Sequence, residues 1–92
     1  MLEKHIEKKV KDYARKSGWL VYKFVSPGHR SMPDDIFMKD GDMFFIEFKA
    51  PGKKPTPKQA DEAEKIRNNG FNVYIIDNIG DGYNIVDSWG EV

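Results

Sequence analysis

The chain has 92 residues, of which 39% are hydrophobic and 33% are charged, a composition typical of one small globular domain. It has no cysteine, which excludes disulfide bridges and thiolate metal sites, and no apolar run approaches the roughly 20 residues that cross a bilayer. Its 15 Lys/Arg and 15 Asp/Glu cancel, so it is not a strongly basic nucleic-acid binder, and because no signal-peptide pattern opens the sequence we expect it in the cytoplasm.

The first half of the chain predicts one helix followed by three strands. Apolar residues at helical spacing predict a helix over residues 2–17, which Ser17-Gly18 ends. β-Branched and aromatic residues predict a strand over 19–25, followed by a loop over 26–31. Two more strands, over 35–39 and 43–49, form a hairpin around a turn at 40–42.

The second half predicts a helix, a strand and a less regular end. A loop over 50–55 leads to a helix in which Thr56 is the N-cap, Pro57 takes the first position and Gln59 completes a capping box. A nearly continuous apolar run over 71–77 predicts a buried strand. Residues 79–82 predict a turn, and 83–87 are a candidate for a last edge strand. The order α-β-β-β-α-β predicts a single α/β domain over residues 1–92.

Charge is divided unevenly along the sequence. Residues 1–58 carry 13 Lys/Arg against 8 Asp/Glu, whereas residues 59–92 carry 2 against 7. A surface that binds phosphate would therefore lie in the first part of the chain. A solvated surface with patchy charge explains the same numbers equally well.

Two short stretches, Pro33-Asp34 and Glu47-Phe48-Lys49, carry the strongest functional signal. Glu47 and Lys49 share one face of their strand, about 7 Å apart, and the hairpin returns Asp34 to the same end of that strand. Two carboxylates hold a hard divalent cation, and a cation beside a lysine activates water and stabilises charge on a phosphate. Each motif alone is usually a surface feature. Their joint placement across one hairpin predicts metal-dependent phosphodiester hydrolysis.

A carboxylate from the first helix would complete such a site. Glu7 lies at the edge of the apolar stripe of that helix, and Glu3 lies one turn earlier, so both are candidates. The alternative for Glu7 is an ordinary i,i+4 ion pair with Lys11. Gln59 is either a capping residue alone or a contact to water or phosphate at the start of its helix.

Basic residues around these motifs are candidates for contacts to DNA phosphates. They are Lys23, Arg30, Lys53, Lys54 and Lys58. We interpret His29 as an ordinary exposed histidine, Trp19 and Trp89 as core or interface residues, and Asp35 as a residue that supports Asp34 or is exposed.

These stretches, together with residues 23–28, 45–55, Gln59 and 70–74, resemble the PD-(D/E)xK nucleases and, more closely, the VRR-NUC (virus-type replication-repair nuclease) family. The resemblance runs from Glu3 to about Asp77. It implies a restriction-endonuclease-like core, in which a mixed sheet is flanked by helices, and a Mg²⁺ or Mn²⁺ cofactor. Two positions depart from the family's pattern: Ser31 stands where a glycine is usual and Asp35 where an apolar residue is usual.

The resemblance also implies roles for individual residues. Asp34 and Glu47 would be metal ligands, with the carbonyl of Phe48 as a further ligand, and Lys49 would orient or activate the attacking water. The family's glutamine matches Gln59. In related junction resolvases the helix glutamate lies eleven residues before the glycine that ends the helix, and this spacing selects Glu7.

The resemblance further implies a homodimer that cuts branched DNA, such as four-way (Holliday) junctions. It would act in a bacterial cell or a phage-infected host. Two alternatives stay open. One is a non-catalytic DNA-binding module with a nuclease-like fold, and the other is a flap or nicking nuclease.

Overall fold

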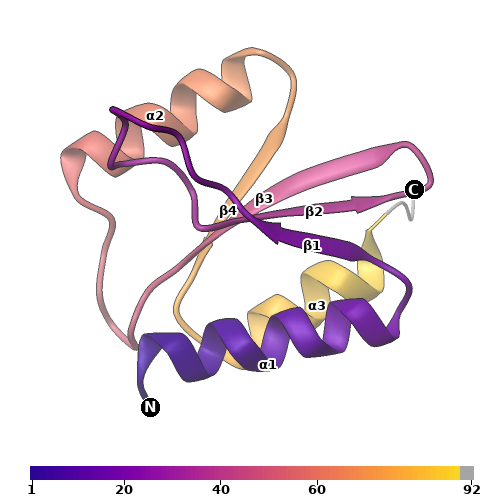
Figure 1. The fold of residues 1–92 in the computed structure, drawn as a ribbon. Helices are drawn as coiled ribbons and strands as arrows, with labels where there is room; N and C mark the ends of the chain where they lie inside the picture. The colour runs from indigo at the N-terminus through magenta and orange to yellow at the C-terminus, as the bar shows by residue number, and fades with distance from the viewer. Residues whose placement is uncertain (90–92) are drawn as a thin grey trace.

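A computed structural model describes residues 1–89 as a four-stranded sheet with three helices (Figure 1). Its elements are α1 (Glu3–Lys16), β1 (Leu20–Lys23), β2 (Asp35–Lys39), β3 (Asp42–Phe48), α2 (Pro57–Asn68), β4 (Asn72–Ile76) and α3 (Ile79–Ser88). The predicted α/β class and the order of the first six elements are confirmed. The domain predicted over 1–92 extends three residues beyond the described range. None of the described helices has the length and apolarity needed to span a bilayer.

The sheet is mixed, and its strands lie in the order β1-β2-β3-β4. β1, β2 and β3 pair antiparallel, whereas β4 runs parallel to β3 after the chain has passed through α2. Asp35 pairs with Ile46 across the hairpin. The start of β2 and the end of β3 therefore lie side by side, and this places Asp34 next to the Glu47-Phe48-Lys49 stretch.

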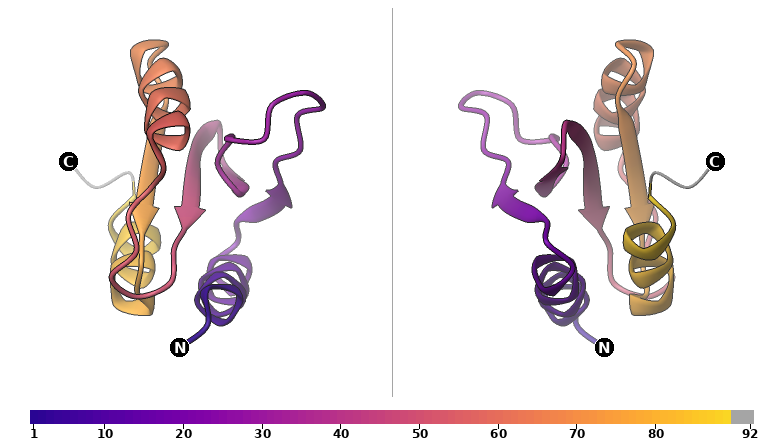
Figure 2. Two further views of the ribbon diagram at one scale, coloured as in Figure 1. Left: turned by 90° about the vertical axis from the view of Figure 1, so that its left-hand side faces the viewer. Right: turned by 90° about the vertical axis from the view of Figure 1, so that its right-hand side faces the viewer.

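Helices cover both faces of the sheet (Figure 2). α1 and α3 pack on one face and α2 on the other, over β3 and β4. Alternation along β3 divides its side chains between two cores: Phe44, Ile46 and Phe48 join the core under α1 and α3, while Phe45 packs with Ala63 of α2. This is the division that the period-2 pattern of the strand predicts.

Aromatic rings fill the larger of the two cores. Phe37 stacks on Phe44 with ring centroids 4.8 Å apart, and Trp19 meets Phe44 edge-on at 4.9 Å. Trp89 packs against the same cluster, with its ring centroid 4.7 Å from that of Phe44. The interpretation of Trp19 and Trp89 as core or interface residues is confirmed, since both pack in this core.

The structure corrects the prediction for the last element. Residues 79–88 form one helix, not a turn over 79–82 followed by a strand over 83–87. Asn78 caps this helix, because its side-chain oxygen accepts a hydrogen bond of 2.8 Å from the backbone N–H of Asp81. Gly82 had suggested a turn, but it instead lies where α3 meets Val10 of α1 and Ile76 of β4, with no room for a Cβ.

The β4 strand is an edge strand of the described sheet, although its apolar run had predicted a buried one. Val73 points toward α2 and Ile76 toward the core under α1 and α3, and both are buried. A strand covered on both faces needs apolar residues at successive positions. The apolar run of β4 therefore indicates that helices cover both faces of this strand, and it does not indicate a central position in the sheet.

A buried ion pair joins α1 to the start of β2. Lys11 Nζ lies 3.1 Å from Asp35 Oδ1, and the Asp35 side chain is fully buried. Of the two alternatives for Asp35, an exposed side chain is therefore wrong, and support of Asp34 stays a prediction. Burial raises the pKa of Asp35 to about 7, and the neighbouring carboxyl group of Glu7 acts in the same direction, against the effect of Lys11.

The contact at Gly82 predicts that alanine is much more destabilising at Gly82 than at Gly80, the other glycine of α3. In Gly82→Ala the new methyl group meets Val10 and Ile76, and we expect overpacking of the core to lower the free energy of unfolding by about 1–3 kcal/mol. Gly80→Ala is the matched control, because its Cβ would meet only the Asn78 side chain at 3.4 Å. Urea denaturation measures both variants. Equal stabilities would contradict the close packing of α3 on α1.

The raised pKa of Asp35 predicts a pH-dependent contribution to stability. Between its ordinary value of 3.8 and about 7, the folded state binds more of this proton than the unfolded state does. Raising the pH through this window therefore lowers the free energy of unfolding. We expect the unfolding free energy of the wild type, minus that of Asp35→Asn, to fall as the pH rises across the window. A difference that stays constant in urea denaturation would mean that Asp35 is ionised throughout.

Candidate functional site

Four of the predicted site residues meet at one end of the sheet. Asp34 Oδ2 accepts a hydrogen bond of 2.7 Å from the backbone N–H of Phe48. Lys49 Nζ lies 3.3 Å from Glu47 Oε2 and donates a hydrogen bond of 2.6 Å to Gln59 Oε1. The start of β2, the end of β3 and the first turn of α2 therefore contribute to one constellation.

Regular backbone holds these side chains in place. The N–H of Phe24 donates to the carbonyl of Asp34 at 2.9 Å, which closes the base of the loop between β1 and β2. The N–H of Lys49 donates to the carbonyl of Ile76 at 2.8 Å and continues the pairing of β3 with β4. Glu47 and Lys49 therefore keep the strand alternation and both point to the α2 side of the sheet.

Gln59 has two roles in the structure. Its backbone N–H donates to Thr56 Oγ1 at 3.2 Å, and its Oε1 accepts from the N–H of Thr56 at 2.9 Å, so the predicted capping box is confirmed. The same Oε1 accepts the hydrogen bond from Lys49. The cap of α2 thereby fixes the position of the lysine.

The two carboxylates of this constellation are buried enough for their charge to be costly. Glu47 is 3% exposed, and burial raises its pKa, with Lys49 opposing the rise and the charge of Asp34 adding to it. Burial also raises the pKa of Asp34, against the hydrogen bond from Phe48. Glu47 Oε2 has Lys49 Nζ as an ion-pair partner at 3.3 Å but forms no aligned hydrogen bond within the described residues. A cation between the carboxylates would offset this cost.

The donor set fits a hard divalent cation. Mg²⁺ prefers oxygen ligands, keeps several waters and is often held by one or two carboxylates together with substrate phosphates. Asp34, Glu47 and the carbonyl of Phe48 supply such ligands. Within residues 1–89, no three acidic or histidine side chains lie together as a metal cluster. The geometry therefore suits a cation held by two carboxylates and completed by water or substrate.

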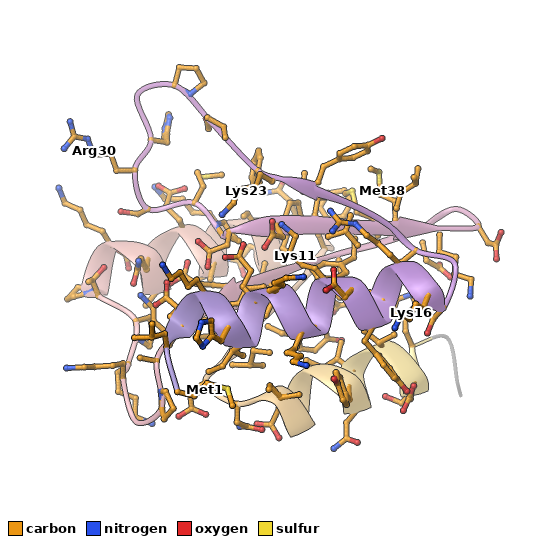
Figure 3. The ribbon with its side chains drawn as sticks, turned by 60° about the horizontal axis from the view of Figure 1, so that its bottom comes forward. Met1, Lys11, Lys16, Lys23, Arg30 and Met38 are labelled. Atoms are coloured by element: carbon orange, nitrogen blue, oxygen red, sulfur yellow. The ribbon has the colours of Figure 1, made fainter. Side chains whose placement is uncertain are left out.

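The structure does not bring Glu7 into this pair. Glu7 Oε2 lies 3.0 Å from Lys23 Nζ and 3.8 Å from Lys11 Nζ, and Figure 3 shows both lysines on the α1 side of the molecule. Burial alone would raise the pKa of Glu7, but the neighbouring carboxyl group of Asp35, the hydrogen bond from Lys23 and the charges of Lys23 and Lys11 hold it below its ordinary value. Glu7 is therefore the centre of a second polar network under α1.

Both helix glutamates nevertheless act electrostatically on the site. The charge of Glu7 contributes to the raised pKa of Asp34, and the charge of Glu3 contributes to that of Glu47. Each glutamate is thus near a different one of the two carboxylates. The assignment of Glu7 as a metal ligand stays a prediction, and Glu3 stays its competitor.

The predicted DNA-binding residues lie in three places. Arg30 and Lys58 line one cleft between the β1–β2 loop and α2. Lys23 lies on the α1 side, in its ion pair with Glu7. Lys53 and Lys54 are exposed in the loop between β3 and α2.

The polar network under α1 was the part of this region that the sequence analysis missed. Lys11 was considered only as an ion-pair partner of Glu7, and Asp35 was not expected to be buried. A signal was present, because the alternation of β2 places Asp35 on the same face as the fully buried Phe37. A charged residue at an inward position of a strand requires a buried partner.

Known proteins with similar sequence or structure are nucleases or nuclease-family domains. No family model matches the chain. The "Putative nuclease p44" of Acyrthosiphon pisum secondary endosymbiont phage 1 is 43% identical to it over 76 residues, which is 82% of this chain and 82% of that protein.

Two solved structures share the fold. A "VRR_NUC domain" superposes with a TM-score of 0.86 and 27% identity, covering 95% of this chain and 96% of its own. A "VRR_NUC domain protein" superposes with a TM-score of 0.81 and covers 97% of this chain and 88% of its own, although at 14% identity this likeness shows the fold alone. With the site geometry, the 43% identical nuclease and the shared fold, the chain belongs to the VRR-NUC nuclease family.

Proposed function

We propose that this nuclease is a Mg²⁺- or Mn²⁺-dependent endonuclease that hydrolyses phosphodiester bonds in branched DNA. The observation that carries the proposal is the constellation of Asp34, Glu47 and Lys49 at one end of the sheet. Within it, the buried Glu47 Oε2 forms an ion pair with Lys49 Nζ at 3.3 Å but no aligned hydrogen bond with any described residue. Two acids and one amine in this arrangement suit phosphate chemistry better than a purely structural role, which argues against a non-catalytic module.

A divalent cation held by Asp34, Glu47 and the carbonyl of Phe48 would supply Lewis acidity toward the phosphate and a water of lowered pKa. The protein's own contribution begins with Lys49. Its ammonium group is held between Glu47 and Gln59, and the Lys49 side chain is 14% exposed. Little reorganisation is therefore needed to stabilise negative charge that develops beside the attacking water. Water displaces the 3′ oxygen of the cleaved strand.

Basic side chains around the site hold the DNA by its phosphates. Each contact releases counterions, so binding should weaken as the salt concentration rises. The residues we assign to this role are Lys23, Arg30, Lys53, Lys54 and Lys58. We place the activity in the cytoplasm of a bacterial cell or of a phage-infected host.

A homodimer suits cleavage of a four-way junction. One small domain with one site cuts one strand, whereas a two-fold dimer presents two sites to a symmetric substrate. β1 is an edge strand of the described sheet, and its Leu20 and Tyr22 are 56% and 58% exposed. Apolar side chains on an open edge favour association with a second copy. A flap or nicking nuclease of the same fold is the rival specificity.

Removing charge from the constellation should abolish cleavage and spare DNA binding. Asp34→Asn keeps the size and the acceptor for the Phe48 N–H, and we expect it to lower the cleavage rate at least about 100-fold. Lys49→Ala should cost about 100-fold to 1,000-fold for loss of charge stabilisation. Asp42→Asn, at the exposed start of β3, is the matched control. Rates are measured on a labelled four-way junction in Mn²⁺, and affinities in Ca²⁺. A variant that cuts at the wild-type rate would remove its residue from the mechanism.

The junction proposal predicts both a substrate order and an assembly state. In Mg²⁺, the wild type should cut a four-way junction faster than a flap, a nicked duplex or an intact duplex. Sedimentation equilibrium should give twice the mass of one chain at the protein concentration of the assay. A monomer that prefers flaps would support the rival specificity.

A further inference from the structure

A cleft lies between the β1–β2 loop and α2. It has a volume of about 440 Å³, in the range of roughly 300–1,000 Å³ that is typical of small-ligand sites. Figure 2 shows the loop and α2 rising on the same side of the sheet, and Figure 3 shows Arg30 on the projecting loop. The residues that matter for its chemistry are His29, Arg30, Lys58, Asp61, Glu62 and Lys65.

Both walls of the cleft belong to segments that continue along the chain into the candidate active site. The loop returns to the sheet at Asp34, whose carbonyl accepts the hydrogen bond from Phe24 that closes the loop. On the other wall, Lys58 directly precedes Gln59, the partner of Lys49. A tight turn, in which the N–H of His29 donates to the carbonyl of Ser26 at 3.0 Å, shapes the tip of the loop. A molecule in the cleft would therefore lie against the two segments that carry Asp34 and Gln59.

The cleft carries unpaired positive charge. Within the described residues, neither Arg30 nor Lys58 forms an ion pair, whereas Lys65 Nζ lies 3.3 Å from Glu62 Oε1. Arg30 and Lys58 are exposed and come from opposite walls. Two cations from opposite walls of one cleft suit a phosphate group as a shared ligand.

The same cleft also carries carboxylates, which a site for phosphate alone would avoid. Asp61 and Glu62 lie on the α2 wall, and ionised carboxylates act only as hydrogen-bond acceptors. The amino groups of adenine, cytosine and guanine are donors that suit them, and thymine has no amino group. Phosphate acceptors and base donors occur together in a nucleotide. In a duplex one N–H of each amino group is used in base pairing and the other opens only into a groove, while the base itself stays stacked. An unpaired nucleotide can turn out of the stack and present its whole Watson–Crick edge to a cleft together with its phosphate.

We propose that this cleft binds one unpaired nucleotide of the DNA strand beside the cleavage site. Its phosphate lies between Arg30 and Lys58, and its base faces Asp61 and Glu62. The inference rests on the proposed function and deepens it, since it names what the enzyme would recognise at a branch point: a nucleotide released from pairing, with a preference for bases that carry an amino group.

Binding of short single strands tests the cleft apart from catalysis. Fluorescence anisotropy in Ca²⁺ compares labelled oligo(dA), oligo(dC), oligo(dT) and a duplex of equal length. We expect the wild type to prefer oligo(dA) and oligo(dC) over oligo(dT) by about fivefold or more, because only these bases offer amino donors to the carboxylates. Asp61→Asn with Glu62→Gln should remove this preference. Glu64→Gln, on α2 but outside the cleft, should keep it.

Arg30→Ala with Lys58→Ala should weaken binding to every single strand by about tenfold, and loss of two phosphate contacts should lower the salt slope by about 1.4. Lys9→Ala with Lys16→Ala removes the same charge from exposed positions of α1 and should leave the single-strand affinity nearly unchanged.

Two results would overturn the inference. One is a duplex that binds as tightly as the single strands and depends equally on Arg30 and Lys58. The other is a carboxylate variant that binds all sequences more tightly with an unchanged base preference. Cleavage in Mn²⁺ is scored in parallel. Base-dependent binding without cleavage of any DNA would support the cleft and contradict the proposed function.

Discussion

The register of the β2–β3 hairpin determines where every proposed catalytic group lies. With Asp35 opposite Ile46, the residue before β2 meets the last residues of β3, and Asp34 accepts its hydrogen bond from Phe48. A slip of one residue would turn Glu47 toward α1 and α3 and away from Gln59. Both faces of β3 are covered, so such a slip would also exchange the residues of the two cores. The packing of ordinary apolar side chains therefore sets the geometry of the charged ones.

Two buried ion pairs flank this hairpin on opposite faces of the sheet. Lys11 and Asp35 lie under α1, and Lys49 and Glu47 lie under the start of α2. Burying a charge is expensive even with a partner, and apolar residues of similar volume are often more stabilising. The two pairs are adjacent to the residues we assign to chemistry, which is where a protein retains charge at the expense of stability.

Much of the fold and the centre of the site could be predicted, because both depend on local periodicity. The alternation of β3 placed Glu47 and Lys49 on one face, and the capping-box pattern placed Gln59 at the start of α2. The α3 helix was missed because glycine was taken as a sign of a turn, although Gly82 serves a close contact with Val10 that depends on tertiary packing. The network of Glu7, Lys11 and Asp35 depends in the same way on how α1 lies against the sheet. Sequence spacing cannot supply that angle.

The Oε1 atom of Gln59, which accepts two hydrogen bonds, limits which residues can replace Gln59. One amide oxygen receives both the N–H that opens α2 and the ammonium group of Lys49. A replacement of Gln59 that suits only the helix would leave Lys49 with its ion pair to Glu47 alone, and one that suits only the lysine would leave the N–H of Thr56 without its acceptor. The position of the Lys49 amine and the N-terminal cap of α2 thus depend on the same side chain, so a substitution of Gln59 affects both.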